Sequence, residues 1–346
     1  MIELCGMMPE EITELIADMG QSAFRGKQVL EWVNKGVAIE NMSNLSAAFR
    51  TQLSQRAVTN SVKVDQIRTS KIDGTEKFLF ALSDGHLVEG VLMRYKHGAT
   101  LCLSTQVGCR MGCAFCASTL DGCARNLTPG EMVGQVLNAN EHLAKTGERV
   151  HNLVLMGSGE PLDNYDNVVK FLRLITDERM LNLSNRAISL STCGLVDQMD
   201  RFSREGIPVT LSLSLHAPND VIRAKLMPIA RVHTIDKTLA ACKRYIEKTG
   251  RRIIIEYAMV DGLNSSVDCA IELASRLRGM QCHVNVIPLN AIAERPLQPP
   301  PKKQIDAFME KLTQLHISVT RRREMGDDIE GACGQLRRRE VQNRHG

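Results

Sequence analysis

The chain has 346 residues, of which 43% are hydrophobic and 24% charged, and its formal net charge is +4. This length allows one large domain with a smaller one beside it, and the composition is that of a globular protein. No stretch approaches the roughly 18 apolar residues of a membrane helix, and the N-terminus lacks a secretory signal. Eleven cysteines in such a chain predict a cytoplasmic protein, in which clustered thiols bind metals or act in catalysis.

The first part of the chain predicts two small units. Residues 1–57 contain segments in which apolar residues recur at helical spacing, and residues 58–98 alternate as strands do. Asp73-Gly74 and Asp84-Gly85 supply turns between these strands. We therefore expect a small helical domain followed by a short β extension. The expected helices are 9–19, 25–33 and 46–53, and the expected strands are 62–67, 77–80 and 87–93.

From residue 99 to residue 322 the pattern changes to a strand, a loop and a helix, and it repeats. Six such units in succession predict a parallel sheet with right-handed crossovers. A doubly wound sheet and a barrel both fit, but six units are too few for an eightfold barrel. We therefore predict an α/β fold with an open, partial (βα)6 barrel. The expected strands are Thr100–Gln106, Asn152–Met156, Ala187–Thr192, Val209–Leu215, Arg252–Met259 and His283–Pro288, and the expected helices are Pro129–Lys145, Asn164–Ile175, Leu195–Arg204, Thr234–Lys248, Ser266–Arg278 and Lys302–Leu315.

Three cysteines fall within eight residues, just after the first strand of this repeat. Cys109, Cys113 and Cys116 have the spacing C-x3-C-x2-C, which allows their thiolates to converge on one inorganic centre. Three protein ligands suit a four-iron cluster that keeps one iron open, whereas a structural zinc site requires four protein ligands. The alternatives are a zinc site completed by Cys102 or Cys123, and cysteines with no shared role.

Polar or glycine residues also stand at the carboxyl ends of other predicted strands. Reactive groups of parallel α/β folds collect at the carboxyl ends of the strands. We therefore expect these residues to share one edge of the sheet with the cysteines, although each alone also suits a turn, a core hydroxyl or a helix cap. They are Gly157–Pro161, Ser191–Gly194, Ser214–His216 and Asn290.

Together these motifs resemble the radical S-adenosylmethionine (SAM) superfamily. The fuller set is similar to the RlmN/Cfr family of RNA adenine methyltransferases, and the similarity covers nearly the whole chain. The similar stretches are Phe24–Gln28, Met42–Ser46, Leu101–Cys116, Met156–Asn164, Ser214–Asn219 and Gly326–Leu336.

The resemblance implies a role for each matching position. The three clustered cysteines would hold a 4Fe–4S cluster, whose open iron chelates the amino and carboxylate groups of SAM. Cys333 would be the cysteine that is itself methylated, Cys102 the second catalytic cysteine, and Glu89 a proton acceptor. The implied contacts to SAM are Gly159, Glu160, Ser191, Ser214, Leu215, His216 and Asn290.

The implied reaction uses two molecules of SAM per turnover to methylate carbon 2 of an adenosine in 23S ribosomal RNA (rRNA) and in tRNA. One SAM methylates Cys333, the second gives a radical that activates this methyl group, and the methyl carbon adds to the adenine ring. Cys102 then forms a disulfide with Cys333 as the RNA is released. The same apparatus also serves carbon-8 methylation, which confers antibiotic resistance, although residues 159–165 and 322–326 look closer to the carbon-2 branch. A zinc-stabilised RNA-binding module is the alternative from a different class.

The resemblance also implies partners. RNA contacts are expected from Arg25 and Lys27 and from the arginines near Cys333, in a catalytic-cysteine segment with a basic tail that spans residues 323–346. A frayed, solvated end is the alternative for this tail. We also expect a monomer, no membrane, and an electron donor such as flavodoxin or ferredoxin. The remaining cysteines, expected to be core or incidental, are Cys5, Cys123, Cys193, Cys242, Cys269 and Cys282.

Overall fold

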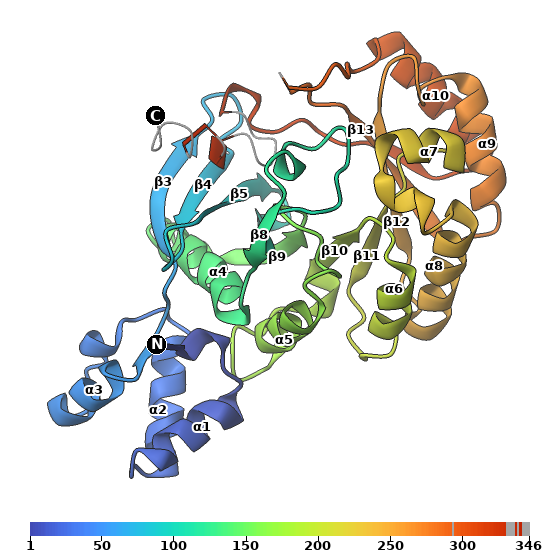
Figure 1. Cartoon of the computed structure of the whole chain (residues 1–346). Coiled ribbons are helices and arrows are strands. Elements are labelled where there is room, and N and C mark those ends of the chain that lie inside the picture. The colour runs from blue at the N-terminus through green and yellow to red at the C-terminus, as the bar shows by residue number, and fades with distance from the viewer. Residues whose placement is uncertain (293, 330–335, 338, 341–346) are drawn as a thin grey trace.

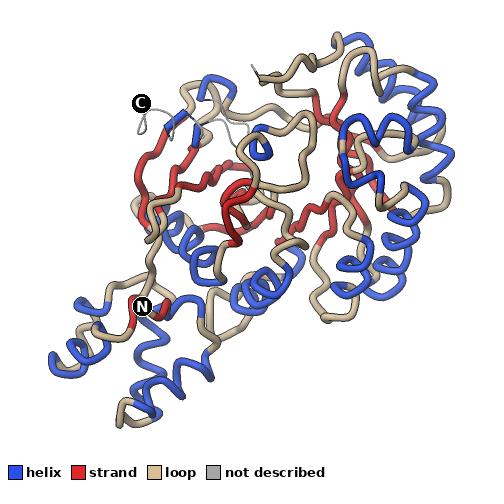
Figure 2. Tube along the Cα trace, in the orientation of Figure 1, coloured by secondary structure: helices blue, strands red, loops and turns tan. Residues whose placement is uncertain are grey.

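The computed structural model describes residues 1–292, 294–329, 336–337 and 339–340. Its largest element is a sheet of ten strands in the order β14-β13-β12-β11-β10-β9-β6-β5-β4-β3. Helices lie along the outside of the curved sheet, as Figures 1 and 2 show. Since β14 and β3 are the two edges, the sheet remains open.

Within the ten-stranded sheet, the seven strands from β6 to β14 run parallel and form the predicted partial barrel. The α/β class and the open (βα)6 architecture are therefore confirmed, and the predicted helices end close to where the structure ends them. The strands are β6 (Gly98–Cys102), β9 (Val150–Leu155), β10 (Ile188–Thr192), β11 (Thr210–Ser214), β12 (Ile253–Met259), β13 (Cys282–Pro288) and β14 (Val319–Arg321). The helices are α4 (Pro129–Ala144), α5 (Tyr165–Thr176), α6 (Val196–Phe202), α7 (Asp220–Leu226), α8 (Ile235–Thr249), α9 (Val267–Leu277) and α10 (Lys302–Gln314).

The predicted strand Thr100–Gln106 is wrong as a single element. Strand β6 ends at Cys102, and β7 (Gln106–Gly108) pairs with β8 (Cys123–Asn126) in a separate sheet. Ser104 explains the break, because its backbone N–H donates to the Gln135 side chain at 3.0 Å and its hydroxyl donates to the Glu89 carbonyl at 2.7 Å. These side-chain partners draw the chain out of the sheet ladder.

The N-terminal unit is helical, as predicted, and lies at one end of the molecule (Figure 1). Its core is apolar and is built from one face of each helix, including Ile12, Ile16, Val29 and Leu53. The short strand β1 (Ile2–Glu3) pairs with β2 (Ala57–Val58) and closes the unit. Its helices are α1 (Pro9–Asp18), α2 (Ala23–Val33) and α3 (Ala47–Ser54).

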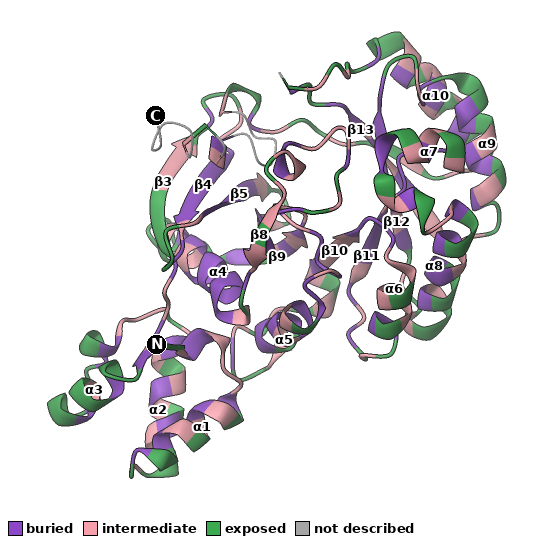
Figure 3. Cartoon of the chain, in the orientation of Figure 1, coloured by how far each residue is buried: buried purple, intermediate pink, exposed green. Residues whose placement is uncertain are grey.

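The β extension consists of β3 (Lys63–Thr69), β4 (Glu76–Ala81) and β5 (Leu87–Tyr95), which pair antiparallel with one another. Strand β5 also pairs with β6, with Val91 opposite Cys102, so the extension continues the barrel sheet. Figure 3 shows that β4 is buried while the edge strand β3 is largely accessible. Among the described residues, no helix is both long and apolar enough to cross a bilayer.

Candidate active site

The cysteine triplet lies in the loop that connects β7 to β8. The loop is closed at its base by the Cys109 backbone N–H, which donates to the Gly122 carbonyl at 2.8 Å. Gly108 precedes it with φ of 82°, and a Cβ there would collide with the same Gly122 carbonyl, so this position requires glycine. Further along, the Ala114 N–H donates to the Leu226 carbonyl at 2.8 Å and attaches the loop to the end of α7.

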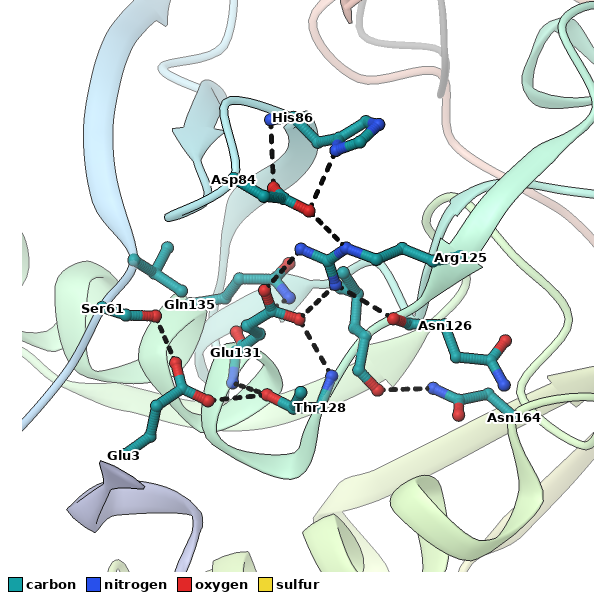
Figure 4. A network of polar contacts seen from close by, with 12 residues as sticks. Glu3, Ser61, Asp84, His86, Arg125, Asn126, Thr128, Glu131, Gln135 and Asn164 are labelled. Atoms are coloured by element: carbon teal, nitrogen blue, oxygen red, sulfur yellow. Dashed lines mark hydrogen bonds and ion pairs between the residues drawn. The ribbon is translucent and has the colours of Figure 1, made fainter. Parts of the chain in front are cut away.

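A polar network behind this loop fixes β8 (Figure 4). The Arg125 guanidinium donates to both Glu131 oxygens at 2.7 and 2.8 Å and to Asp84 at 2.6 Å. Hydrogen bonds to Glu131 and then to Asp84 raise the pKa of Arg125. Thr128 caps α4 together with Glu131, and its hydroxyl donates to Glu3 of the N-terminal unit at 2.7 Å. The network therefore ties the cysteine loop to the β extension and to the N-terminal unit.

Cys109, Cys113 and Cys116 line one cavity of about 270 Å³, which we call the thiol cavity. Cys109 and Cys113 are buried and Cys116 is half-buried. Burial raises the pKa of Cys109 to about 12, and the pKa of Cys113 rises for the same reason and through the nearby thiolates. Thiols in such a place need a cationic centre to become thiolates.

The three thiols fit a 4Fe–4S cluster better than a single ion. Among the described residues, no three His, Cys, Asp or Glu side chains converge closely enough to hold one metal ion. A cluster binds each thiolate at a different iron, so its ligands stand apart around it. Apolar side chains pack around the loop, among them Leu226, Met227 and Leu289. Phe115 of the loop also packs edge-on against His216, with ring centroids 4.8 Å apart.

The Gly159-Glu160 turn after β9 forms another wall of the thiol cavity. Gly159 has φ of 111°, and a Cβ there would lie 2.7 Å from Gln106. The buried Glu160 carboxylate accepts the backbone N–H groups of Cys193 at 2.7 Å and Leu162 at 3.1 Å. Burial raises the pKa of Glu160, although these donors oppose the rise. The carboxylate thus joins the loops that follow β9 and β10.

Ser191, Ser214 and His216 reach the thiol cavity from β10 and the end of β11. The two serine hydroxyls lie 3.3 Å apart, while Leu215 is fully buried and does not line the cavity. Burial and then the Arg223 charge lower the pKa of His216 to about 3. Its Nδ1 accepts the Ala258 N–H at 2.9 Å, so the ring is neutral and its other nitrogen carries the hydrogen.

Cys102 lies in a second cavity, of about 180 Å³, which we call the Cys102 cavity. It adjoins the thiol cavity, because Met156, Asn290 and Arg322 line both. Asn290 is exposed, so it stands where the shared wall opens to solvent. The structure thus brings Cys102 beside the clustered cysteines but in a separate compartment.

Glu89 is buried on β5, and its carboxylate lies 3.2 Å from the ammonium of Lys77. The backbone N–H of Arg337 donates to its other oxygen at 2.5 Å. Cys333, the residue that the resemblance places at the centre of the chemistry, lies outside the described residues.

Several residues that line the thiol cavity were not among those predicted from the sequence. Glu256 lies in the middle of β12, is buried, and accepts the Asn285 side-chain N–H at 3.1 Å. Burial raises its pKa, and the Arg322 charge opposes this. Cys193, predicted to be core or incidental, is buried and also lines this cavity. A signal was available for Glu256, since it is the one charged residue in the apolar run Ile253–Met259.

Comparisons with known proteins agree with this geometry. Residues 103–273 match the Radical SAM superfamily, and residues 2–59 match the family described as the ribosomal RNA large subunit methyltransferase N-terminal domain. A "Probable dual-specificity RNA methyltransferase RlmN" of Alkaliphilus oremlandii is 51% identical over 343 residues, which cover 99% of each chain. A Clostridium novyi protein of the same description is 48% identical, over 96% of this chain and 97% of the relative. A solved radical SAM methyltransferase from Sphaerobacter thermophilus is 40% identical with a TM-score of 0.94, over 97% of this chain and 99% of that one.

The fold and the thiol cavity define a radical SAM enzyme, a class whose cofactors are a 4Fe–4S cluster and SAM. The chain belongs to the RlmN family of RNA methyltransferases. The predicted enzyme class is therefore confirmed, and the alternative of a zinc-stabilised RNA-binding module is wrong.

Proposed function

We propose that this enzyme methylates carbon 2 of an adenosine in both 23S rRNA and tRNA. The observation that carries the proposal is the adjacency of the two cavities, which share the lining residues Met156, Ile287, Pro288, Asn290 and Arg322. SAM cleaved in the thiol cavity would thus generate its radical next to the compartment in which Cys102 would meet the base. Relatives described as dual-specificity RNA methyltransferases, about half identical over the full length, support the choice of substrates.

The site residues divide the work between these compartments. Cys109, Cys113 and Cys116 would hold the cluster, which supplies the one-electron reduction that cleaves SAM. Gly159, Glu160, Ser191, Ser214, Leu215, His216 and Asn290 would shape the SAM site.

The remaining steps belong to the chain's own side chains. Cys333 would carry the methyl group that adds to the adenine ring, and Glu89 would take the ring proton. The adduct would give up its unpaired electron, which the oxidised cluster would take back, and attack by the Cys102 thiolate on the Cys333 sulfur would then break the bond to the methylene carbon and form a disulfide. The electron pair of that bond would stay with the carbon, which would take up a proton and leave on the RNA as the new methyl group.

The remaining parts of the chain would serve the RNA. We propose four units: residues 1–57, 58–98, 99–322 and 323–346. In the unit of residues 1–57, Lys27 is exposed, whereas the Arg25 guanidinium donates to the Asn44 carbonyl at 3.2 Å. Lys27 is therefore the more accessible contact to phosphate. We further propose a cytoplasmic monomer that receives electrons from a flavodoxin or a ferredoxin.

The test is the nucleoside product. The reconstituted enzyme is incubated anaerobically with SAM, a reductant, and either a 23S rRNA fragment or tRNA, and the digested RNA is examined by mass spectrometry. We expect 2-methyladenosine from both RNAs, and none from the Cys102→Ala variant. A product that is only 8-methyladenosine would replace the carbon-2 proposal with carbon-8 methylation. A product from one RNA alone would overturn dual specificity.

A further inference from the structure

One face of the β extension is buried where an edge extension would ordinarily meet solvent. Successive residues of a strand point to opposite faces, and Phe78, Phe80, Val88 and Leu92 point into the main core. The residues between them point the other way. We call this side the Glu89 face, and it comprises Arg68, Lys77, Leu79, Leu87, Glu89, Val91, Met93 and Cys102.

The C-terminal part of the chain contacts this face at both of its ends. At one end Met325 packs against Val91, Met93 and Cys102. At the other end Leu336 is fully buried against Leu79 and Leu87. In Figure 1 the red C-terminal segment lies over the β3–β5 end of the sheet.

Polar contacts fix the position of residues 326–328, which follow Met325 at the first of these ends. The Asp328 carboxylate accepts the Ser70 hydroxyl at 2.6 Å and the Lys71 N–H at 2.9 Å. The Gly326 N–H donates to Asp73 at 3.0 Å. These contacts fasten residues 326–328 to the turn between β3 and β4.

The second end is fastened by Arg337 and Glu340. The Arg337 N–H donates to one oxygen of Glu89 at 2.5 Å, and Glu340 pairs with Arg68 at 3.0 Å. The other oxygen of Glu89 lies 3.2 Å from Lys77, which is itself fully buried. The Glu89 carboxylate is thus shared between a strand neighbour and the C-terminal segment.

We propose that the Glu89 face is the docking platform for the C-terminal segment of the same chain, through residues 325–329, 336–337 and 339–340, and that Lys77 is a positioning residue at its centre. A buried ion pair is a costly way to join two strands, because apolar residues would do so without the desolvation penalty. The pair does what apolar residues cannot: it fixes one carboxylate rotamer so that the second oxygen meets the Arg337 amide.

The inference rests on the proposed function in one respect. Cys333 lies in sequence between the two fastened ends, residues 326–328 and 336–340. The fastened ends lie on the face that carries Cys102, the thiol that we propose to react with Cys333. Loss of docking would let SAM be cleaved without delivery of the carbon to RNA.

The test uses the full-length, reconstituted enzyme and the Lys77→Met variant, which keeps the side-chain length and removes the charge. Lys63→Met is the matched control, since Lys63 is exposed on β3 of the same sheet. Hydrogen exchange is followed in peptides from 324–340 and, as an internal reference, from β12. The second readout is the number of SAM molecules cleaved per methyl group transferred, which misfolding alone does not change.

We expect Lys77→Met to raise exchange in 324–340 about tenfold while β12 is unchanged, and to raise the cleavage-to-transfer ratio by a similar factor. Lys63→Met should match the wild type in both. Unchanged exchange would overturn the docking platform, and faster exchange with an unchanged ratio would overturn the positioning role.

If Lys77→Met does not fold, Leu336→Ala provides the test, because it truncates only the docked side chain. Unchanged exchange in 324–340 of that variant would also overturn the platform. The exchange measurement needs no RNA, and the ratio counts methyl groups at any ring carbon. A failure of the carbon-2 proposal would therefore remain distinguishable from a failure of this inference.

Discussion

The two cavities differ in how the fold holds their cysteines. In the thiol cavity the three sulfurs come from one loop, which a short hairpin and two backbone hydrogen bonds keep closed. In the Cys102 cavity the thiol sits on a strand, and its neighbours come from β5, from the ends of β9 and β13, and from residues 322–325. A loop can place several ligands around one centre, whereas strand pairing fixes a single group against distant parts of the chain. The first design suits cofactor binding and the second suits alignment of a substrate.

The largest effect is expected from Cys113→Ala, which removes one buried thiol from the loop. Because a cluster with two protein ligands is poorly held, iron content, SAM cleavage and RNA methylation should fall together by at least about a hundredfold. Iron and sulfide analysis with the visible absorption spectrum measures this. Cys123→Ala is the control, because Cys123 is on β8 and does not line the thiol cavity. Iron loss only in the control would show that Cys123 is the ligand.

The Cys102→Ala variant should distinguish the role of the Cys102 cavity from that of the thiol cavity. The thiol cavity is untouched, so iron content and SAM cleavage should stay near the wild-type level. Methylated RNA should fall by at least about a hundredfold, because the variant lacks the thiol that we propose to release Cys333 from the RNA. Gel analysis should show a protein–RNA adduct, which a second digestion step can trace to Cys333. Loss of iron in this variant would contradict the division between the cavities.

His216 gives a smaller, pH-dependent effect. Its pKa is about 3 in the folded protein, against 6.5 ordinarily. Below pH 6.5 His216 becomes protonated in the unfolded chain but stays neutral in the folded chain. The contribution of His216 to the free energy of unfolding is therefore fully present at neutral pH and is lost as the pH falls toward 3. Between pH 7 and 5.5 the wild type should lose about 1 kcal/mol more unfolding free energy than His216→Asn, whose amide oxygen can replace Nδ1. Equal losses in denaturant titrations would contradict this.

The smallest effect is expected at Asp73. Burial alone would raise its pKa, but hydrogen bonds from the Thr75 and Gly326 N–H groups outweigh this and lower the pKa to about 2. Asp73→Asn should weaken the first fastening of the C-terminal segment by a few tenths of a kcal/mol, since the group is near the surface. Hydrogen exchange in residues 324–329 should rise about twofold, with little change between pH 5 and 9. Asp18→Asn, on a distant exposed position, should leave it unchanged.

Loop motifs and helix periodicity could be read from the sequence because they depend on neighbours along the chain. The cysteine spacing and the Thr128 capping box are examples, and both occur in the structure. The break after Cys102 could not be read, since it depends on Gln135, which lies 31 residues beyond Ser104. Helix α7 was also missed, although Asn219 caps it in the way that short helices commonly begin.

The strand-borne groups were harder to interpret for the same reason. The sequence around Lys77 predicts an ordinary exposed lysine, because only the register of β4 against β5 places this side chain beside Glu89. Glu256 and Arg322 come from β12 and from the chain beyond β14, and no local pattern links them. Pairing between distant segments therefore set the limit of the sequence interpretation.

The continuity of the ten-stranded sheet has a consequence for how RNA is accommodated. Hydrogen-bonded strands run without a gap from β3, through β5 and β6, to β14. A hinge between the extension and the barrel would have to break the ladder that joins Val91 to Cys102. The enzyme therefore offers RNA a rigid sheet, so the bending and unstacking that expose a target base fall to the RNA.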